Sequence, residues 1–332
     1  MLSILKIEQK ATVFRELATM VRAGMSLSEA LHALESRRCY PRLKQAISDA
    51  AFRVPDGTRL SQVLRDYPQE FSKLTTGVIA AGEETGKLDE VLDRVAGYLE
   101  REYSLRQLVS RETFYPKVLG VIVLLMPVAT RTIIAWIMQS FWAALWILIK
   151  TLALYAVIIG IPAMLIYTAY KAIINTEQGR YSVDAFKLRV PLFGLVVRRL
   201  ALAKFARALA YTYGAGLPLS QAAELAGAVT GNALIAQNIS AAVPHLRKGG
   251  KLSEVLAGSA DIDTMVVRML QTGEQTGNIE ETMERVAEHF EIACESSIRR
   301  MAVLALPIGV IIMGIIVGFM VISFYGGYYA DF

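Results

Sequence analysis

Cysteine and histidine, the residues most often used to hold metals or run covalent chemistry, are scarce in this sequence. Of 332 residues, two are cysteine and three are histidine. Cys39 and Cys294 have no second cysteine near them, so we expect two free thiols rather than a disulfide or metal site. His32, His245 and His289 have no neighbour at ligand spacing, which also argues against a metal site.

Catalytic signatures are missing as well. The sequence has no Gly-x-Ser-x-Gly elbow, no His-Glu-x-x-His helix and no carboxylate pair within an apolar run. The net charge of +5 is small and both signs are interspersed, so there is no basic stripe for nucleic acid. We therefore expect no catalytic activity, no cofactor, no metal and no direct contact with nucleic acid.

Long apolar runs are abundant, by contrast. Hydrophobic residues make up 54% of the chain and are concentrated in two blocks. From Val118 to Tyr170 only Arg131 and Lys150 are charged, a length that suits two membrane spans, and Met301 to Ala330 suits a third. Three residues suit an interfacial aromatic belt between the first two spans: Trp136, Trp142 and Trp146.

The sequence contains one module twice. Gly82-Glu83-Glu84-Thr85-Gly86 returns as Gly273-Glu274-Gln275-Thr276-Gly277, and the same displacement carries Arg94 onto Arg285 and Pro116 onto Pro307. A displacement one residue longer carries Arg15 and Gly24 onto Arg207 and Gly216. Agreement over so long a register indicates an internal duplication.

Each copy is predicted to form six helices. Apolar residues recur at helical spacing, no strand pattern occurs, and Ser26 with Glu29 has the capping-box spacing. We expect the fifth helix of the first copy to run from about Lys73 to Ala81 and to end at a loop formed by Gly82 to Gly86. The sixth helix has no stop signal before Pro116 and should lead into the first span. Gly24 and Gly216 should end the first helix of each copy.

These elements predict an all-α membrane protein with two homologous six-helix cytoplasmic bundles and three transmembrane helices. The expected divisions are a first module at 1–112, a hairpin of two spans at 113–170, a basic connection at 171–200, a second module at 201–300, and a third span with a short outer tail at 301–332.

The distribution of basic residues predicts the orientation. Lysine and arginine flank the hairpin on the module side, and only Arg131 and Lys150 lie toward its closed end. Two crossings return the chain to its starting side, so both modules face the cytoplasm and the C-terminus lies outside. Trp142 and Tyr328 should then lie at the outer surface. Met1 to Lys10 has no apolar core, so it is not a cleavable signal peptide, and an internal span must direct insertion.

Glu83 and Glu274 recur inside the glycine-bounded motif. The stretch from Gly82 to Lys87 differs from a phosphate-binding loop in spacing, and Asn278 replaces Lys87 in the second copy. Three roles remain open for the carboxylates: a helix-end cap, which we favour, a surface contact, or a weak cation site.

Several residues are candidates for contacts rather than chemistry. Gly314 and Gly318 have a spacing that allows close helix packing, although ordinary flexibility of a span explains them equally well. Pro116 and Pro307 mark the entries to spans. The candidates for repeat-specific or partner contacts are Arg15, Gly24, Gly82, Glu83, Thr85, Gly86, Arg94, Arg207, Gly216, Gly273, Glu274, Thr276, Gly277 and Arg285.

The order of elements closely resembles the inner-membrane platform protein of type II secretion systems and type IV pili, the GspF/PilC family. The likeness rests on both Gly-Glu-x-Thr-Gly motifs and on the stretches 190–194, 205–210 and 215–219. The resemblance implies a non-enzymatic, homo-oligomeric platform in the bacterial inner membrane. It also implies partners: a cytoplasmic hexameric ATPase, pilin-like subunits and other assembly proteins.

Two alternatives belong to other classes. A small oligomeric transporter component needs polar or broken helices around a site in the membrane; Pro127 and Pro162 could break helices, but no aspartate or glutamate lies within any span. A membrane-bound hydrolase needs a nucleophile and a base at recognisable spacing, and the sequence offers neither.

Overall fold

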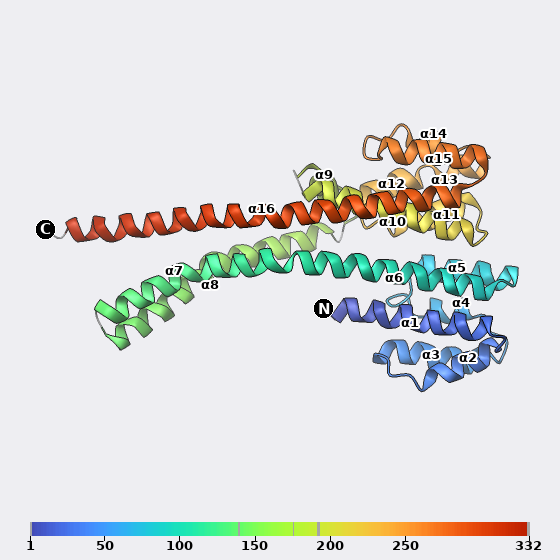
Figure 1. The fold of residues 1–332 in the computed structure, drawn as a ribbon, viewed down its shortest axis with the longest axis horizontal. Helices are drawn as coiled ribbons and strands as arrows, with labels where there is room; N and C mark the ends of the chain where they lie inside the picture. The colour runs from blue at the N-terminus through green and yellow to red at the C-terminus, as the bar shows by residue number, and fades with distance from the viewer. Residues whose placement is uncertain (1, 139, 175, 191–192, 331–332) are drawn as a thin grey trace. The chain divides into compact units, whose positions relative to one another are not determined.

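The computed structural model describes residues 2–138, 140–174, 176–190 and 193–330 (Figure 1). Every regular element within those ranges is helical, which confirms the all-α class. Pro191 and Leu192 lie outside the described residues. The helices are α1 Leu2–Arg22, α2 Leu27–Glu35, α3 Pro41–Arg53, α4 Leu60–Arg65, α5 Lys73–Thr85, α6 Leu88–Glu112, α7 Phe114–Met138, α8 Phe141–Ile174, α9 Glu177–Arg189, α10 Phe193–Gly214, α11 Leu219–Ala228, α12 Ala233–Ser240, α13 Val243–Arg247, α14 Leu252–Leu256, α15 Thr264–Thr276 and α16 Ile279–Ala330.

The helices form two compact units. One unit combines Met1–Leu108 with Asp184–Glu295 and therefore holds both copies of the repeated module. The other combines Val109–Val183 with Ser296–Phe332 and holds the apolar helices. Each unit is described below by itself.

The helix boundaries of the first module follow its local signals. The capping box at α2 is confirmed: the Ser26 hydroxyl accepts from Glu29 N at 3.3 Å, and Glu29 Oε2 accepts from Ser26 N at 3.0 Å. Pro41 occupies the first turn of α3, where its missing N–H leaves no hydrogen bond unmade. Gly24 follows α1 with φ +92°, as its predicted stop requires.

The cores of the two modules are built from equivalent positions. Leu17 and Leu209, Leu60 and Leu252, Ile79 and Leu270, and Leu92 and Met283 are each at most 2% exposed. These pairs come from α1, α4, α5 and α6 in the first copy and from α10, α14, α15 and α16 in the second. The duplication seen in the sequence is therefore a duplication of packing.

The predicted loop at Gly82 to Gly86 is mostly helix, so that expectation is wrong. α5 continues through Gly82, Glu83 and Thr85 and ends only at Gly86, which adopts the left-handed conformation at φ +73°. The second copy ends in the same way at Gly277, with φ +74°. One glycine in each motif, rather than two, is needed for the turn, because only the last one has positive φ.

The second module departs from the first at one helix and in the connection before it. The segment equivalent to α3 is divided into α12 and α13, and Pro244 lies in the first turn of α13. A proline at that place removes a helical donor, so the chain turns at Ala241 and starts again. The connection contains α9, and α10 starts at Phe193, upstream of the expected start at 201; the division points stay predictions.

Among the described residues, three helices are long and apolar enough to span a membrane, as predicted. α7 and α8 pack together as a hairpin, with Val128, Ala135 and Ala144 buried between them. Pro127 and Pro162 lie inside α7 and α8 without ending either helix. α16 runs unbroken for 52 residues and includes Pro307 (Figure 1). The side chain of Tyr328 lies outside the described side chains.

Candidate functional site: the duplicated polar contacts and the contact between modules

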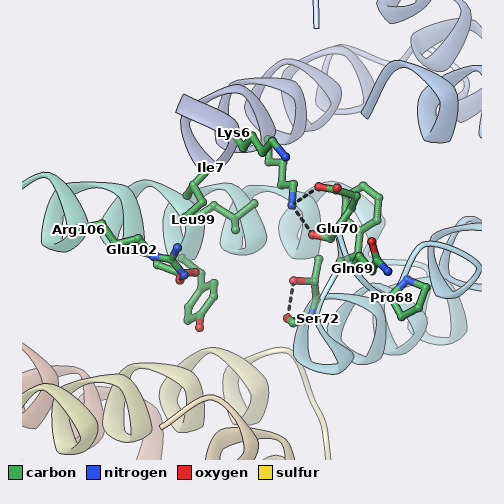
Figure 2. Close-up of a pocket in the computed structure, with 13 residues that line it drawn as sticks. Lys6, Ile7, Pro68, Gln69, Glu70, Ser72, Leu99, Glu102 and Arg106 are labelled. Atoms are coloured by element: carbon green, nitrogen blue, oxygen red, sulfur yellow. Dashed lines mark hydrogen bonds and ion pairs between the residues drawn. The ribbon is translucent and has the colours of Figure 1, made fainter. Parts of the chain in front are cut away.

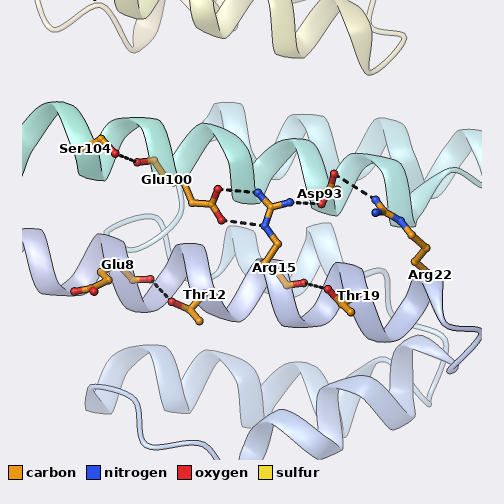
Figure 3. A network of polar contacts seen from close by, with 8 residues as sticks. All are labelled: Glu8, Thr12, Arg15, Thr19, Arg22, Asp93, Glu100 and Ser104. Atoms are coloured by element: carbon orange, nitrogen blue, oxygen red, sulfur yellow. Dashed lines mark hydrogen bonds and ion pairs between the residues drawn. The ribbon is translucent and has the colours of Figure 1, made fainter.

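Arg15 holds the first helix of its module to the sixth. Its guanidinium makes two hydrogen bonds to Glu100, Nε to Oε1 at 2.9 Å and Nη2 to Oε2 at 2.7 Å, and Nη1 also pairs with Asp93 (Figure 3). Arg22 reaches the other oxygen of Asp93 at 3.3 Å. The hydrogen bond to Glu100, against some desolvation, raises the pKa of Arg15. α1 and α6 are thus joined by a bidentate contact between Arg15 and Glu100 and by the ion pairs of Arg15 and Arg22 with Asp93.

Arg207 repeats this contact in the second module. Its Nε and Nη2 lie 2.9 and 2.8 Å from the two carboxylate oxygens of Glu291, and Nη1 lies 3.3 Å from Glu284. Glu284 and Glu291 stand in the second copy where Asp93 and Glu100 stand in the first. The arginines were predicted from the sequence and their carboxylates were missed, although the displacement that relates Glu83 to Glu274 relates those carboxylates too.

Glu83 and Glu274 cap helices in their own modules. Glu83 accepts from Ser61 N at 3.3 Å and from the Ser61 hydroxyl, at the start of α4. Glu274 accepts from Leu252 N at 2.6 Å and from Ser253 N and its hydroxyl, at the start of α14. The favoured capping role is therefore what the geometry supports, but the capped helix is earlier in the chain rather than the one that follows the motif.

Gly82 and Gly273 allow two helices to approach closely. A Cβ atom on Gly82 would lie 2.7 Å from Val91 Cβ, and one on Gly273 would lie 2.4 Å from Thr282 Oγ1. A side chain at either position would push α5 from α6, or α15 from α16. Thr85 and Thr276 each bond back to a carbonyl one turn earlier, at 2.8 and 2.9 Å.

Arg94 and Arg285 are equivalent in sequence and differ in partner. Arg285 pairs at 2.6 Å with Glu281, one turn away on the same helix. Arg94, on α6, pairs instead with Glu280 on α16 and so connects the two modules. Gly214 leaves room for this pair, because a Cβ atom there would lie 2.4 Å from Glu280 Cδ.

Apolar contacts extend this contact between modules. The Tyr98 and Tyr211 rings meet edge to face with centroids 5.8 Å apart, and Leu225 lies against Gly77, where an added Cβ would be 3.0 Å from it. α5 also packs on α10 and α11. A groove of about 590 Å³ follows this contact and is lined by residues of both modules, among them Phe71, Lys73, Leu217 and Leu225.

A second hollow of about 560 Å³ belongs to the first module alone (Figure 2). Lys10 lies at its edge, 2.9 Å from Glu70, and the Tyr40 hydroxyl donates to the same carboxylate at 2.6 Å. Burial opposes ionisation of Glu70, but the bonds from Tyr40 and Lys10 outweigh it and lower the pKa of Glu70. Burial and then the bond to Glu70 raise the pKa of Tyr40.

The glycine contact among the membrane helices lies at an unexpected place. Neither Gly314 nor Gly318 has another atom within 4 Å of an added Cβ, whereas one on Gly309 would lie 2.6 Å from Leu119 of α7. Gly309 therefore makes the close approach between α16 and α7, two residues after Pro307. Close helix packing at Gly314 and Gly318 stays a prediction. Pro116 lies in the first turn of α7.

Known proteins share both copies of the module. The family model described as "Type II secretion system (T2SS), protein F" matches residues 13–135 and again 205–327. The type IV pilus assembly protein TapC of Aeromonas hydrophila is 27% identical, over 95% of this chain and 79% of its own length. PilC of Thermus thermophilus is 29% identical, over 92% and 78%. Type II secretion system protein F of Vibrio cholerae is 28% identical, over 87% and 74%.

Proposed function

Because this chain belongs to the type II secretion system protein F family, we propose that it couples a cytoplasmic ATPase to the assembly of pilin-like subunits. The family comprises non-enzymatic assembly platforms, and its members named above serve type II secretion or type IV pilus assembly. The chain is a multi-pass membrane protein of that family. We infer from the same membership that the chain lies in the bacterial inner membrane.

The observation that supports coupling is the joining of two copies of the module within one compact unit. Force is transmitted well only through a rigid body. The Arg94–Glu280 pair joins α6 to α16, and the Tyr98–Tyr211 contact joins α6 to α10. α16 then continues as one helix into its apolar segment. Movement of the second module would reach that segment through the backbone of α16.

The orientation and assembly state form part of the proposal. Both modules face the cytoplasm, where an ATPase has its nucleotide, and the C-terminus lies outside. Several copies associate in the membrane, because three spans leave little room for a pathway within one chain and symmetric copies could face a ring-shaped motor. A cysteine placed at Lys87 should resist labelling from outside, and one placed at Trp142 should be labelled; the reverse pattern would refute this orientation.

The functional test uses the ion pair between modules. Arg94→Glu and Glu280→Arg should each lower ATPase co-purification and filament assembly or secretion in cells that lack their own platform gene. The double variant, in which the charges are exchanged, should restore both. Arg285→Glu is the matched control, since the equivalent arginine pairs only within its own helix and its change should have little effect.

Three results would contradict the platform role. One is nucleotide hydrolysis by the purified protein alone, and another is failure of the wild-type protein to retain ATPase or pilin-like subunits after gentle solubilisation. The third is solute uptake by liposomes that contain only this protein, which would support the transporter alternative.

A further inference from the structure

Two basic residues stand alone in the membrane hairpin. Arg131 on α7 and Lys150 on α8 are the charged residues between Val118 and Tyr170, and the sequence from 113 to 176 has no aspartate or glutamate. Both side chains are exposed, and neither has a hydrogen bond or ion pair with a residue that the structure describes. Exposed cations in an apolar segment need a counter-charge from outside the chain.

The two cations lie at nearly the same height in the hairpin. At about 1.5 Å per residue, Arg131 is about 10 Å from the end of α7 at Met138, and Lys150 is about 14 Å from the start of α8 at Phe141. The two helices are antiparallel neighbours, so these positions differ in height by only about 3 Å. Either side chain is long enough to bridge that difference.

Arg131 and Lys150 also lie on the same side of the helix pair formed by α7 and α8. Val128 and Ala135 mark the buried side of α7, and Ala144 marks that of α8. At about 100° per residue, Arg131 lies about 50° from the buried side of α7 and Lys150 about 120° from that of α8, in the same rotational sense. For antiparallel helices an equal sense of rotation leads to the same side of the pair. One anionic group can therefore meet both side chains.

The length of the apolar segments sets the depth of this pair. α7 rises about 26 Å from Phe114 to Arg131, and α8 falls about 32 Å from Lys150 to Lys171. A bilayer has a hydrocarbon core of about 30 Å, so the cations reach the headgroups at the closed end of the hairpin when Phe114 and Lys171 lie at the opposite surface. Deeper insertion would bury two unpaired charges in hydrocarbon.

We propose that Arg131 and Lys150 bind the phosphate of an anionic phospholipid in the leaflet at the closed end of the hairpin. The guanidinium supplies paired donors to phosphate oxygens and the ammonium supplies a second charge. Two cations without a carboxylate nearby favour a lipid with net negative charge over a zwitterionic one. The aromatic residues beyond the pair are suited to the interface: Trp136, Trp142 and Trp146.

The three tryptophans of the sequence all lie in this hairpin, so tryptophan fluorescence reports on it alone. The full-length protein is placed in phosphatidylcholine nanodiscs that contain a low mole fraction of brominated lipid, either phosphatidylglycerol or phosphatidylcholine. Brominated phosphatidylglycerol should be enriched around the hairpin by about fivefold or more, since each basic residue near an anionic lipid contributes about that factor. Excess inorganic phosphate should not abolish this enrichment, because the bound phosphate belongs to a lipid.

The variant Arg131→Gln/Lys150→Gln should reduce the enrichment to none. Lys117→Gln/Lys171→Gln, at the other end of the same helices, is the matched control and should keep it. If the double variant fails to insert, the wild-type protein decides, because its enrichment must fall as salt rises. Equal quenching by the two brominated lipids, an unchanged enrichment in the inserted double variant, or no response to salt would overturn the proposal.

Discussion

Arg15 and Arg207 hold equivalent carboxylates in the two modules, yet 38% of the Arg15 side chain is exposed and only 4% of the Arg207 side chain. The difference comes from the helices that carry them. α1 buries one face, whereas α10 is buried at every position from Phe205 to Ala210 because it packs on α11 and also on α5 of the other module. A contact copied by duplication has thus become internal in one copy and stayed near solvent in the other.

This difference predicts unequal effects of one substitution. Arg207→Ala leaves the Glu291 carboxylate, 14% exposed, without its cation and should cost about 3 kcal/mol of folding stability. Arg15→Ala should cost about 1 kcal/mol or less, since solvent replaces much of the lost contact. Thermal unfolding of the detergent-solubilised chain, followed by circular dichroism, compares the two.

A matched variant separates charge from packing. Arg207→Met with Glu291→Leu removes both charges and should unfold at a higher temperature than Arg207→Ala. Equal losses for Arg15→Ala and Arg207→Ala would show that burial does not distinguish the two modules in solution.

Removing the glutamate caps should destabilise the two modules equally, unlike removing the arginines, because the caps are alike in both modules. Glu83→Ala and Glu274→Ala should each cost about 1 to 2 kcal/mol, since each removes the acceptor for a helix start and for a serine hydroxyl. Hydrogen exchange should rise at Ser61 in the first variant and at Ser253 in the second. Gln275→Ala, at the exposed position next to Glu274, is the control and should change exchange at neither start.

If either capped start keeps its protection after its glutamate is removed, the cap is not what stabilises that helix. If Glu274→Ala is much more harmful than Glu83→Ala, the two modules also differ at this contact.

The smallest expected effect is a difference between the modules in how the stability of one loop depends on pH. The pKa of Glu70 is lowered from its ordinary value of about 4.5, so its contribution to stability is complete above that pH and is lost as pH falls through the lowered value. In the second module Arg198 holds the equivalent loop through the carbonyls of Ala260 and Asp261, a contact without a titrating acceptor. Acid should therefore loosen the loop at Glu70 before the loop at Asp261.

Tyr40→Phe tests this directly. It removes one of the two bonds that lower the pKa of Glu70, so loosening of that loop should begin at a higher pH, with a loss of about 1 kcal/mol near neutrality. Amide hydrogen exchange at Phe71 and Ile262, measured over a pH series, reports the opening of both loops in one experiment. A Tyr40→Phe profile identical to wild type would contradict the assignment.

The helices, the duplication and the three spans could be predicted from the sequence because each depends on local spacing or on length. Ser26 with Glu29 specified a cap between neighbours, and a charge-free run specified a span. The end of α5 could not be predicted, because a glycine at position 82 suggests a helix stop. In the structure Gly82 is needed instead because Val91 of α6 packs closely against it. The division of the third helix in the second copy was not predicted, although Pro244 in the sequence is a signal for it.

The duplicated helical module and the three long apolar helices could be recognised without a structure. Helical periodicity and apolar composition are properties of each segment alone. The sequence also identified Arg15 and Arg207 as equivalent. Only the tertiary structure decided that Arg207 is buried, that Glu83 caps α4, and that Arg94 reaches the other module while Arg285 stays on its own helix. The physical reason is that an ion pair depends on where two helices meet, and these helices are brought together by packing across long stretches of chain rather than by any local pattern.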